Sequence, residues 1–378
     1  MKKFIIVLYS AFLLLFSFFS YLFIDPNLSY LNSIYSGFVF SNRFLTTTFY
    51  TSSIFIFFAF YGTFVWLSYR KKIKVKDIFI LVFITVVILI FSYPAMLSYD
   101  IFNYFTTSKV LFFYHENPYI VMPIEFVDDP LLAFTHAANK VALYGPVWTA
   151  LTGIPYFLGF GNFVINLFAL KFLAGFSYLA TVFLVWKISK NIMPVILLAL
   201  NPLIIIESLV SGHNDIVMMF FALFSFFLLM KKKLGWAIFF FILSILIKYT
   251  TILLIPVFFF VIWRIIRKHE INWGNIFYCS SLLMLFGFFL SPVREEIYPW
   301  YALWFLSFSF LIPNKKLLLY ISIAFSFGLL FRYVPFMFSG THADITPQVK
   351  AIVTFVPAIL VSFYIILRMK LWERIFSR

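Results

Sequence analysis

Long apolar runs separated by short polar or charged connections fill the chain from residue 4 to residue 367. A run of roughly 20 apolar residues crosses about 30 Å of hydrocarbon as an α-helix. The pattern therefore predicts an all-α, polytopic transmembrane helical bundle of about twelve spans, within a range of about 11 to 13. The expected helices lie near residues 4–24, 44–69, 78–97, 163–186, 193–210, 216–230, 235–247, 250–264, 273–291, 299–313, 315–333 and 349–367. No stretch is left for a soluble domain, so residues 1–378 should form a single integral-membrane domain.

Two regions depart from this regular pattern. Residues 146–160 are apolar but contain Gly153 and Pro155, so we expect them to be re-entrant or to lie at the membrane interface. The helices expected at 235–247 and 250–264 are short for a span, and they meet at Lys248. Interrupted backbone at membrane depth is tolerated where protein or a water-filled cavity satisfies its polar groups, which predicts a cavity there.

The distribution of charge predicts the orientation. Only 11% of the residues are charged, against about 25% in soluble domains, and 63% are apolar. Sorted by predicted loop, 21 of the 29 basic residues but only 3 of the 14 acidic residues fall on one side of the membrane. The positive-inside rule makes that side cytoplasmic, with both termini there, in a multi-pass plasma-membrane protein. We interpret the basic side as topology and not as a nucleic-acid surface. Cys279 is the only cysteine, which excludes an internal disulfide.

Polar residues gather in three places that this orientation puts outside the membrane. The first is the long loop 98–144, which begins with Asp100 and has apolar residues at the spacing of interfacial helices. The second is residues 201–215, and the third is residues 291–304. An embedded lysine, Lys248, lies beneath them. Ionisable groups at membrane depth indicate function by default.

Each cluster also has an ordinary explanation. Asp100 is a candidate for a solvated loop carboxylate, His213 for a helix cap, and Trp300 with Tyr301 for an aromatic belt. Glu207 is a candidate partner for Lys171 or Lys248. Three clusters on one face are better explained by a shared site than by three separate accidents.

Several motifs give the chain a family resemblance. They are Asp100 at the start of the outer loop, Asn117-Pro118-Tyr119, Tyr144-Gly145-Pro146 with Trp148, Asn201-Pro202, Gly212-His213-Asn214-Asp215, and Lys248. In this order and topology they resemble the GT-C superfamily of integral-membrane glycosyltransferases, and most of all its polyprenol-phosphate-mannose-dependent mannosyltransferases. The resemblance extends roughly from residue 78 to residue 304. It implies transfer of a hexose, with mannose as the candidate, from a polyprenyl-phosphate donor to an extracytoplasmic glycan, glycolipid or protein acceptor.

The resemblance also suggests roles for the polar residues. Asp100 is expected to be the catalytic base of an inverting transfer, because such a transfer needs one carboxylate to deprotonate the acceptor hydroxyl. The donor phosphate needs fixed cations or donors, for which Lys248, Arg294 and His213 are the candidates. The candidates for binding the sugar and the acceptor are Asn117, Tyr119, Tyr144, Trp148, Glu207, Asn214, Asp215, Trp300 and Tyr301.

Departures from the family pattern leave alternatives open. Metal-dependent members carry Asp-x-Asp near the first loop, whereas here Asp100 is followed by Asn103, and Asp128 and Asp129 are adjacent. No metal or other cofactor is therefore required by the sequence, although Asp100 with Asp215 is a candidate pair for a divalent ion. A retaining route would use Glu207 as nucleophile. The alternative function is a multi-pass transporter or flippase of a lipid-linked sugar, for which no internal repeat is evident.

Overall fold

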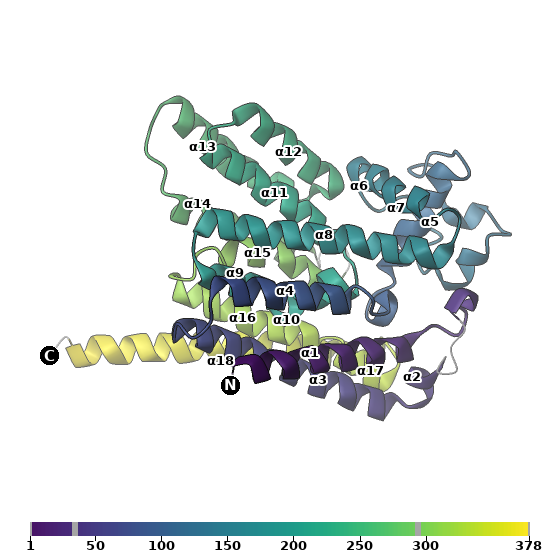
Figure 1. Cartoon of the computed structure of the whole chain (residues 1–378), viewed down its shortest axis with the longest axis horizontal. Coiled ribbons are helices and arrows are strands. Elements are labelled where there is room, and N and C mark those ends of the chain that lie inside the picture. Colours follow the sequence, from purple (N-terminus) through teal and green to yellow (C-terminus); the bar gives the residue numbers. More distant parts are fainter. Residues whose placement is uncertain (1, 32–36, 292–295, 377–378) are drawn as a thin grey trace.

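The computed structural model describes residues 2–31, 37–291 and 296–376, and every regular element among them is helical (Figure 1). The predicted all-α fold is thus confirmed. The α-helices are α1 (Lys2–Ser20), α2 (Phe38–Ser41), α3 (Arg43–Tyr69), α4 (Val75–Leu89), α5 (Asp100–Phe112), α6 (Pro146–Leu151), α7 (Gly153–Leu158), α8 (Phe163–Ser189), α9 (Ile192–Ala199), α10 (Pro202–Ile205), α11 (Asp215–Met230), α12 (Leu234–Ile247), α13 (Ile255–Ile266), α14 (Trp273–Leu290), α15 (Ala302–Ser309), α16 (Lys316–Phe331), α17 (Val334–Ser339) and α18 (Thr346–Phe376). A π-helical turn, η6 (Ile206–Val210), and the 3-10 helices η3 (Pro94–Met96), η7 (Tyr249–Leu254) and η9 (Pro299–Tyr301) complete the elements that shape the site.

Seven helices in the described part of the chain are long and apolar enough to cross a membrane. They are Lys2–Phe23, Arg43–Tyr69, Phe163–Ser189, Tyr249–Ile266, Trp273–Leu290, Lys316–Ser339 and Thr346–Arg368. An eighth candidate is the pair Ile192–Ala199 and Pro202–Val210, which is bent by 57°. The chain is therefore a multi-pass membrane protein, and the count of about twelve spans stays a prediction.

Some expected helices are shorter than the apolar pattern predicts, for local reasons. The stretch 78–97 ends as an α-helix at Leu89, and the chain then turns into η3 at Pro94. The stretch 299–313 contains α15, whose eight residues, about 12 Å long, are all buried. A helix that is apolar on every side fits inside a bundle as well as in lipid. Hydropathy therefore does not separate an internal helix from a spanning one.

The two ends of the bundle differ in character. Figure 1 shows both chain ends toward the left of the view, and α5, α6 and α7 at the right. The long loop at residues 98–144 contains α5 and short 3-10 turns. Residues 146–160 form α6 and α7, each of six residues and about 9 Å long, and neither is long enough to cross a membrane.

The break between α12 and η7 occurs at Lys248, as the sequence predicted. Lys248 has extended backbone angles, φ −154° and ψ 123°, between two helices. The last turn of α12 is joined to the segment before α6, because the Gly145 backbone amide donates to the Ile247 carbonyl oxygen at 2.9 Å. A Cβ atom at Gly145 would lie 2.1 Å from the Leu246 carbonyl oxygen, so the two segments approach as closely as glycine allows. This contact places Tyr144 and Trp148 in the same region as Lys248.

Candidate functional site

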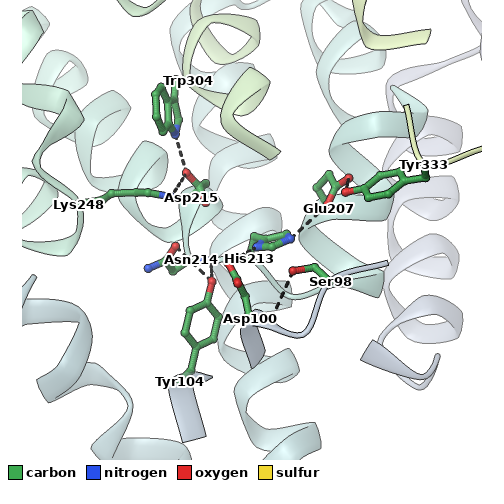
Figure 2. Close-up of polar contacts among 10 residues, drawn as sticks. All are labelled: Ser98, Asp100, Tyr104, Glu207, His213, Asn214, Asp215, Lys248, Trp304 and Tyr333. Carbon is green, nitrogen blue, oxygen red and sulfur yellow. Dashed lines mark hydrogen bonds and ion pairs between the residues drawn. The ribbon is translucent and has the colours of Figure 1, made fainter. Parts of the chain in front are cut away.

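The polar site forms where α5 and α11 begin (Figure 2). Asp100 is the first residue of α5, and its backbone amide donates to the Ser98 hydroxyl at 3.3 Å. Asp215 is the first residue of α11. The turn before α11 passes through Gly212, whose φ of +70° is the left-handed conformation that glycine adopts without strain. Figure 2 shows the first residues of α5 and α11 in the same site, although they are more than a hundred positions apart in the sequence.

Glu207 is carried by the π-helical turn η6, all five residues of which are buried. A π-helix is rare, adds a residue to the turn and is frequently found at functional sites. Here the distorted turn directs Glu207 toward His213 and Tyr333. The Tyr333 hydroxyl donates to Glu207 Oε1 at 2.9 Å.

His213 lies between two carboxylates. Its Nδ1 atom is 3.6 Å from Asp100 Oδ2, and its Nε2 atom is 3.3 Å from Glu207 Oε2. The imidazole is fully buried and stacks on Trp300, with ring centroids 4.0 Å apart and an angle of 16° between the planes. Within residues 2–31, 37–291 and 296–376, neither ring nitrogen makes a hydrogen bond of regular geometry. The carboxylates therefore act on His213 by charge and proximity more than by directed hydrogen bonds.

Asp215 forms the second part of the site, with Lys248 and Trp304. Lys248 Nζ lies 3.0 Å from Oδ1 and 3.2 Å from Oδ2 of Asp215, and the Trp304 indole N–H donates to Oδ1. The same ammonium group lies 4.1 Å from the centre of the Tyr301 ring. Asp215 is fully buried and Lys248 is 15% exposed. A buried carboxylate bound to one cation and one indole is strongly fixed in position.

Aromatic side chains surround the same region. The Tyr104 hydroxyl lies 3.4 Å from the side-chain Oδ1 of Asn214 and accepts from the backbone N–H of Asn214 at 3.3 Å. Tyr104 packs edge-on against Tyr144 and Trp148, with ring centroids 4.8 and 5.0 Å away. Burial, and then the charge of Asp100, raise the pKa of Tyr104 and Tyr144 well above the usual range of phenols. Both hydroxyls stay protonated at physiological pH and present an O–H to the site.

The remaining sequence candidates are placed less centrally. Asn117 is exposed and accepts from the Tyr119 amide at 3.0 Å, as in a turn. The Tyr119 hydroxyl donates to the Tyr144 carbonyl oxygen at 2.9 Å, which fixes the loop to the start of α6. Arg294 lies outside the described residues.

Neither lysine proposed as a partner of Glu207 contacts it. Lys171 is fully buried and donates to Leu89 O at 3.1 Å and to Ser92 Oγ at 3.0 Å, at the end of α4. Lys248 is bound to Asp215. Lys171 therefore donates hydrogen bonds at the C-terminal end of α4. Glu207 contacts His213 and Tyr333 instead.

Sequence reasoning did not select Tyr104, Trp304 or Tyr333. Their signals were weak, because 22 Tyr and 57 Phe are scattered along the chain and aromatic residues carry little information on their own. Tyr104 and Trp304 do lie in polar clusters that the sequence marked. Tyr333 follows Arg332, and a charged residue within the apolar helix expected at 315–333 was the sequence signal that could have drawn attention to this position.

The candidate metal pair is not supported by the geometry of Asp215. Both of its oxygens face Lys248, and Oδ1 also accepts from Trp304. Among the residues that the structure describes, no three His, Cys, Asp or Glu side chains are grouped as metal ligands.

The described chain is thus a multi-pass helical bundle in which carboxylates, a histidine and a lysine lie close together, an arrangement that fits the GT-C type of integral-membrane glycosyltransferase that a family match supports. One family model matches the chain over residues 11–265, and it is described as Alpha-(1->6)-mannopyranosyltransferase, N-terminal domain. The match covers more than half of the chain, so the chain belongs to this family and is a glycosyltransferase that acts on mannose. No curated protein and no solved structure matches the chain.

The family match agrees with the resemblance drawn from the motifs and extends it. The resemblance began near residue 78, whereas the matched region begins at residue 11 and so includes α3 and most of α1. It also includes Asp100, Glu207, His213, Asp215 and Lys248. It ends at residue 265, before Trp300 and Trp304.

Proposed function

We propose that the protein transfers mannose from a polyprenyl-phosphate donor to an acceptor hydroxyl at the extracytoplasmic face, with inversion, and that Asp100 is the catalytic base. The observation that carries the proposal is a difference in exposure among three nearby acids. The Asp100 side chain is 23% exposed, whereas those of Glu207 and Asp215 are fully buried. Of these three acids, Asp100 alone combines access for a water-borne acceptor with a position among the other polar groups of the site.

The proposed reaction needs a base for the acceptor hydroxyl and a cation for the leaving phosphate. The acceptor oxygen forms a bond to the anomeric carbon while its proton moves to a carboxylate oxygen of Asp100, which contributes typically about 10²- to 10⁴-fold in rate. The bond from the anomeric carbon to the phosphate oxygen breaks, and the leaving polyprenyl phosphate keeps the electron pair. Lys248 supplies a fixed cation for that phosphate, because its position is set by Asp215 and by the Tyr301 ring.

We assign His213 a role that differs from the phosphate contact suggested by the sequence. With Asp100 on one side and Glu207 on the other, the imidazole faces carboxylates and is stacked beneath Trp300. We assign it to positioning Asp100. Glu207, which accepts from Tyr333, lies 3.3 Å from the other ring nitrogen and orients the ring by its charge.

The aromatic residues provide a site for the sugar. Trp148 is buried, and its indole N–H has no hydrogen-bond partner in the part of the chain that is described. A buried N–H without a partner is costly, and a sugar hydroxyl satisfies it. Tyr104 and Tyr144 line the same place and can pack against the sugar ring.

The retaining alternative is less well supported. A nucleophile must reach the anomeric carbon, but Glu207 is fully buried, one of its oxygens accepts from Tyr333, and the other faces His213. Membership of a mannosyltransferase family favours the enzyme over the transporter.

The donor is tested with purified protein in lipid nanodiscs and two labelled substrates. Mannosyl polyprenyl phosphate should give transfer to a mannoside acceptor, and a nucleotide-linked mannose should give none. Transfer from the nucleotide donor alone would contradict the proposed donor.

The orientation is tested with single cysteines in a Cys279→Ser background. Lys140→Cys, in the outer loop, should react with a membrane-impermeant maleimide on intact cells. Lys72→Cys, in the connection between α3 and α4, should react only after permeabilisation. The reverse pattern would place the site on the cytoplasmic side.

A further inference from the structure

Three lysines border a groove between the ends of α8 and α11, away from the transfer site. The groove has a volume of about 470 Å³. Its lining residues are Lys187, Lys190 and Lys231 with Ala180, Phe183, Leu184, Phe220, Phe224 and Phe227. Because α11 runs from Asp215 in the site to Met230, next to Lys231, its 16 residues place the lysine end of the groove about 24 Å from Asp215.

The lysines leave the groove with an uncompensated positive charge. No acidic residue lines it, and none of the three lysines forms an ion pair within residues 2–31, 37–291 and 296–376. Lys187 Nζ lies 4.9 Å from the centre of the Phe183 ring, and Lys231 Nζ lies 5.6 Å from that of Phe227. The ammonium groups therefore stand at the boundary between the polar end of the groove and its apolar wall.

The wall of the groove is apolar and continuous along α11. Phe220, Phe224 and Phe227 follow one another at helical spacing on one face, and the rings of Phe220 and Phe224 are stacked, with centroids 5.8 Å apart. Phe183 of α8 is 52% exposed on the opposite side. From residue 227 to residue 220 the wall runs about 10 Å along the helix axis, away from the lysines.

We propose that this groove binds an anionic phospholipid, with the headgroup phosphate among Lys187, Lys190 and Lys231 and the acyl chains against the phenylalanines. Three cations without counter-ions select an anion, and the adjoining apolar wall selects one that carries hydrocarbon. Basic pockets between membrane helices on the positively charged side are sites of this kind. Lys71 and Lys72 are exposed in a surface turn. Orientation of the chain in the membrane explains their positive charge without a bound ligand.

Lipid bound in the groove would contact both α8 and α11, and α11 begins with Asp215 of the transfer site. A ligand that binds only the folded arrangement raises stability in proportion to its affinity and concentration. We therefore expect the lipid to raise the melting temperature of the protein in detergent, independently of any effect on sugar transfer.

The test is native mass spectrometry of detergent-purified protein with dioleoyl phosphatidylglycerol and, separately, dioleoyl phosphatidylcholine. The variant K187Q/K190Q/K231Q removes the three groove lysines. The variant K71Q/K72Q/K76Q removes the same charge from exposed positions on the same side. Because a surface lysine contributes roughly fivefold to binding of an anionic lipid, the groove variant should lose phosphatidylglycerol by at least about tenfold. The control variant should retain it, and phosphatidylcholine should bind weakly to all three proteins.

Equal loss in the two variants, or equal binding of the two lipids, would overturn the proposal. Inorganic phosphate is a second probe, because displacement of the lipid at millimolar phosphate would show that the apolar wall contributes nothing. A melting temperature that does not rise with phosphatidylglycerol in the wild type would also count against it. None of these measurements uses sugar transfer, so their failure and that of the proposed function are distinguishable.

Discussion

The Nδ1 atom of His213 lies 3.6 Å from the Oδ2 atom of Asp100, so a fully buried imidazole faces the most exposed carboxylate of the site. On its other side the ring faces Glu207, which Tyr333 holds. This order connects the proposed base to a buried carboxylate through one ring. It gives the two buried ionisable groups, Glu207 and His213, a place next to the proposed base.

The first prediction concerns the role of His213. If the ring positions Asp100, His213→Gln and Glu207→Gln should each lower kcat about 10- to 100-fold and change the KM for the donor little, because the reacting carboxylate is affected and donor binding is not. Steady-state kinetics of mannosyl transfer in nanodiscs measure both constants, and thermal melting verifies folding. A raised donor KM with an unchanged kcat would instead assign His213 to the donor phosphate.

The second prediction concerns the pair Asp215 and Lys248. Lys248→Met leaves a buried carboxylate that keeps its hydrogen bond from Trp304 but loses its cation, and removal of one member of a buried ion pair costs about 3–5 kcal/mol. The double variant Lys248→Met with Asp215→Asn removes both charges, so it should recover most of the lost stability. It should not recover transfer, because the cation for the leaving phosphate is still absent. Thermal melting and transfer assays decide the matter, and recovery of transfer in the double variant would remove Lys248 from the mechanism.

The third prediction concerns the contact between α6 and α12. Gly145→Ala places a Cβ atom 2.1 Å from the Leu246 carbonyl oxygen, so the two segments must separate. Because Tyr144 and Trp148 flank Gly145 and Lys248 follows Ile247, we expect at least about a tenfold loss of transfer. The matched control is Gly62→Ala on α3, where nothing lies within 4 Å of the new Cβ atom and activity should be unchanged. Equal activity of the two variants would show that the contact does not position the site.

The fourth prediction concerns stability and pH. Burial raises the pKa of Glu296, but Lys350 at 3.1 Å and Arg332 at 2.8 Å outweigh it, so the pKa lies below the usual 4.5. A carboxyl with a lowered folded-state pKa adds stability above its unfolded pKa and loses it as the pH falls through the folded value.

The melting temperature of Glu296→Gln should therefore lie below that of the wild type at pH 6 to 7. The difference should shrink as the pH falls below the usual 4.5 and close once it is below the lowered folded-state pKa. Exposed Glu116, which forms no ion pair in the described part of the chain, provides the control variant Glu116→Gln. A difference that is independent of pH would show that the charge of Glu296 is not what stabilises the fold.

The sequence predicted the membrane helices well where charged residues bound an apolar run, as at α1, α3 and α8. It did not predict the 57° bend between α9 and α10, because hydropathy is the same for a straight and a bent apolar helix. The cause is local: Asn201 caps α10, accepting from the Leu203 and Ile204 amides, and Pro202 cannot continue a helix.

The site was predicted in composition but not in its pairings. The sequence grouped Asp100, His213 and Lys248 on one face, and the structure brings Asp100 and His213 together. The sequence left open whether Lys248 pairs with Glu207, because such a pairing depends on how each helix is rotated about its axis. The π-helical turn at Ile206–Val210 changes that rotation and has no signature in the residue pattern.

The most direct test of the central claim is the transfer rate of Asp100→Asn with labelled mannosyl polyprenyl phosphate, in nanodiscs and beside the wild type. The amide keeps the size of the side chain and removes its basicity, so we expect a loss of at least about 100-fold with normal membrane insertion and melting. Transfer at the wild-type rate would contradict the assignment of Asp100 as the catalytic base.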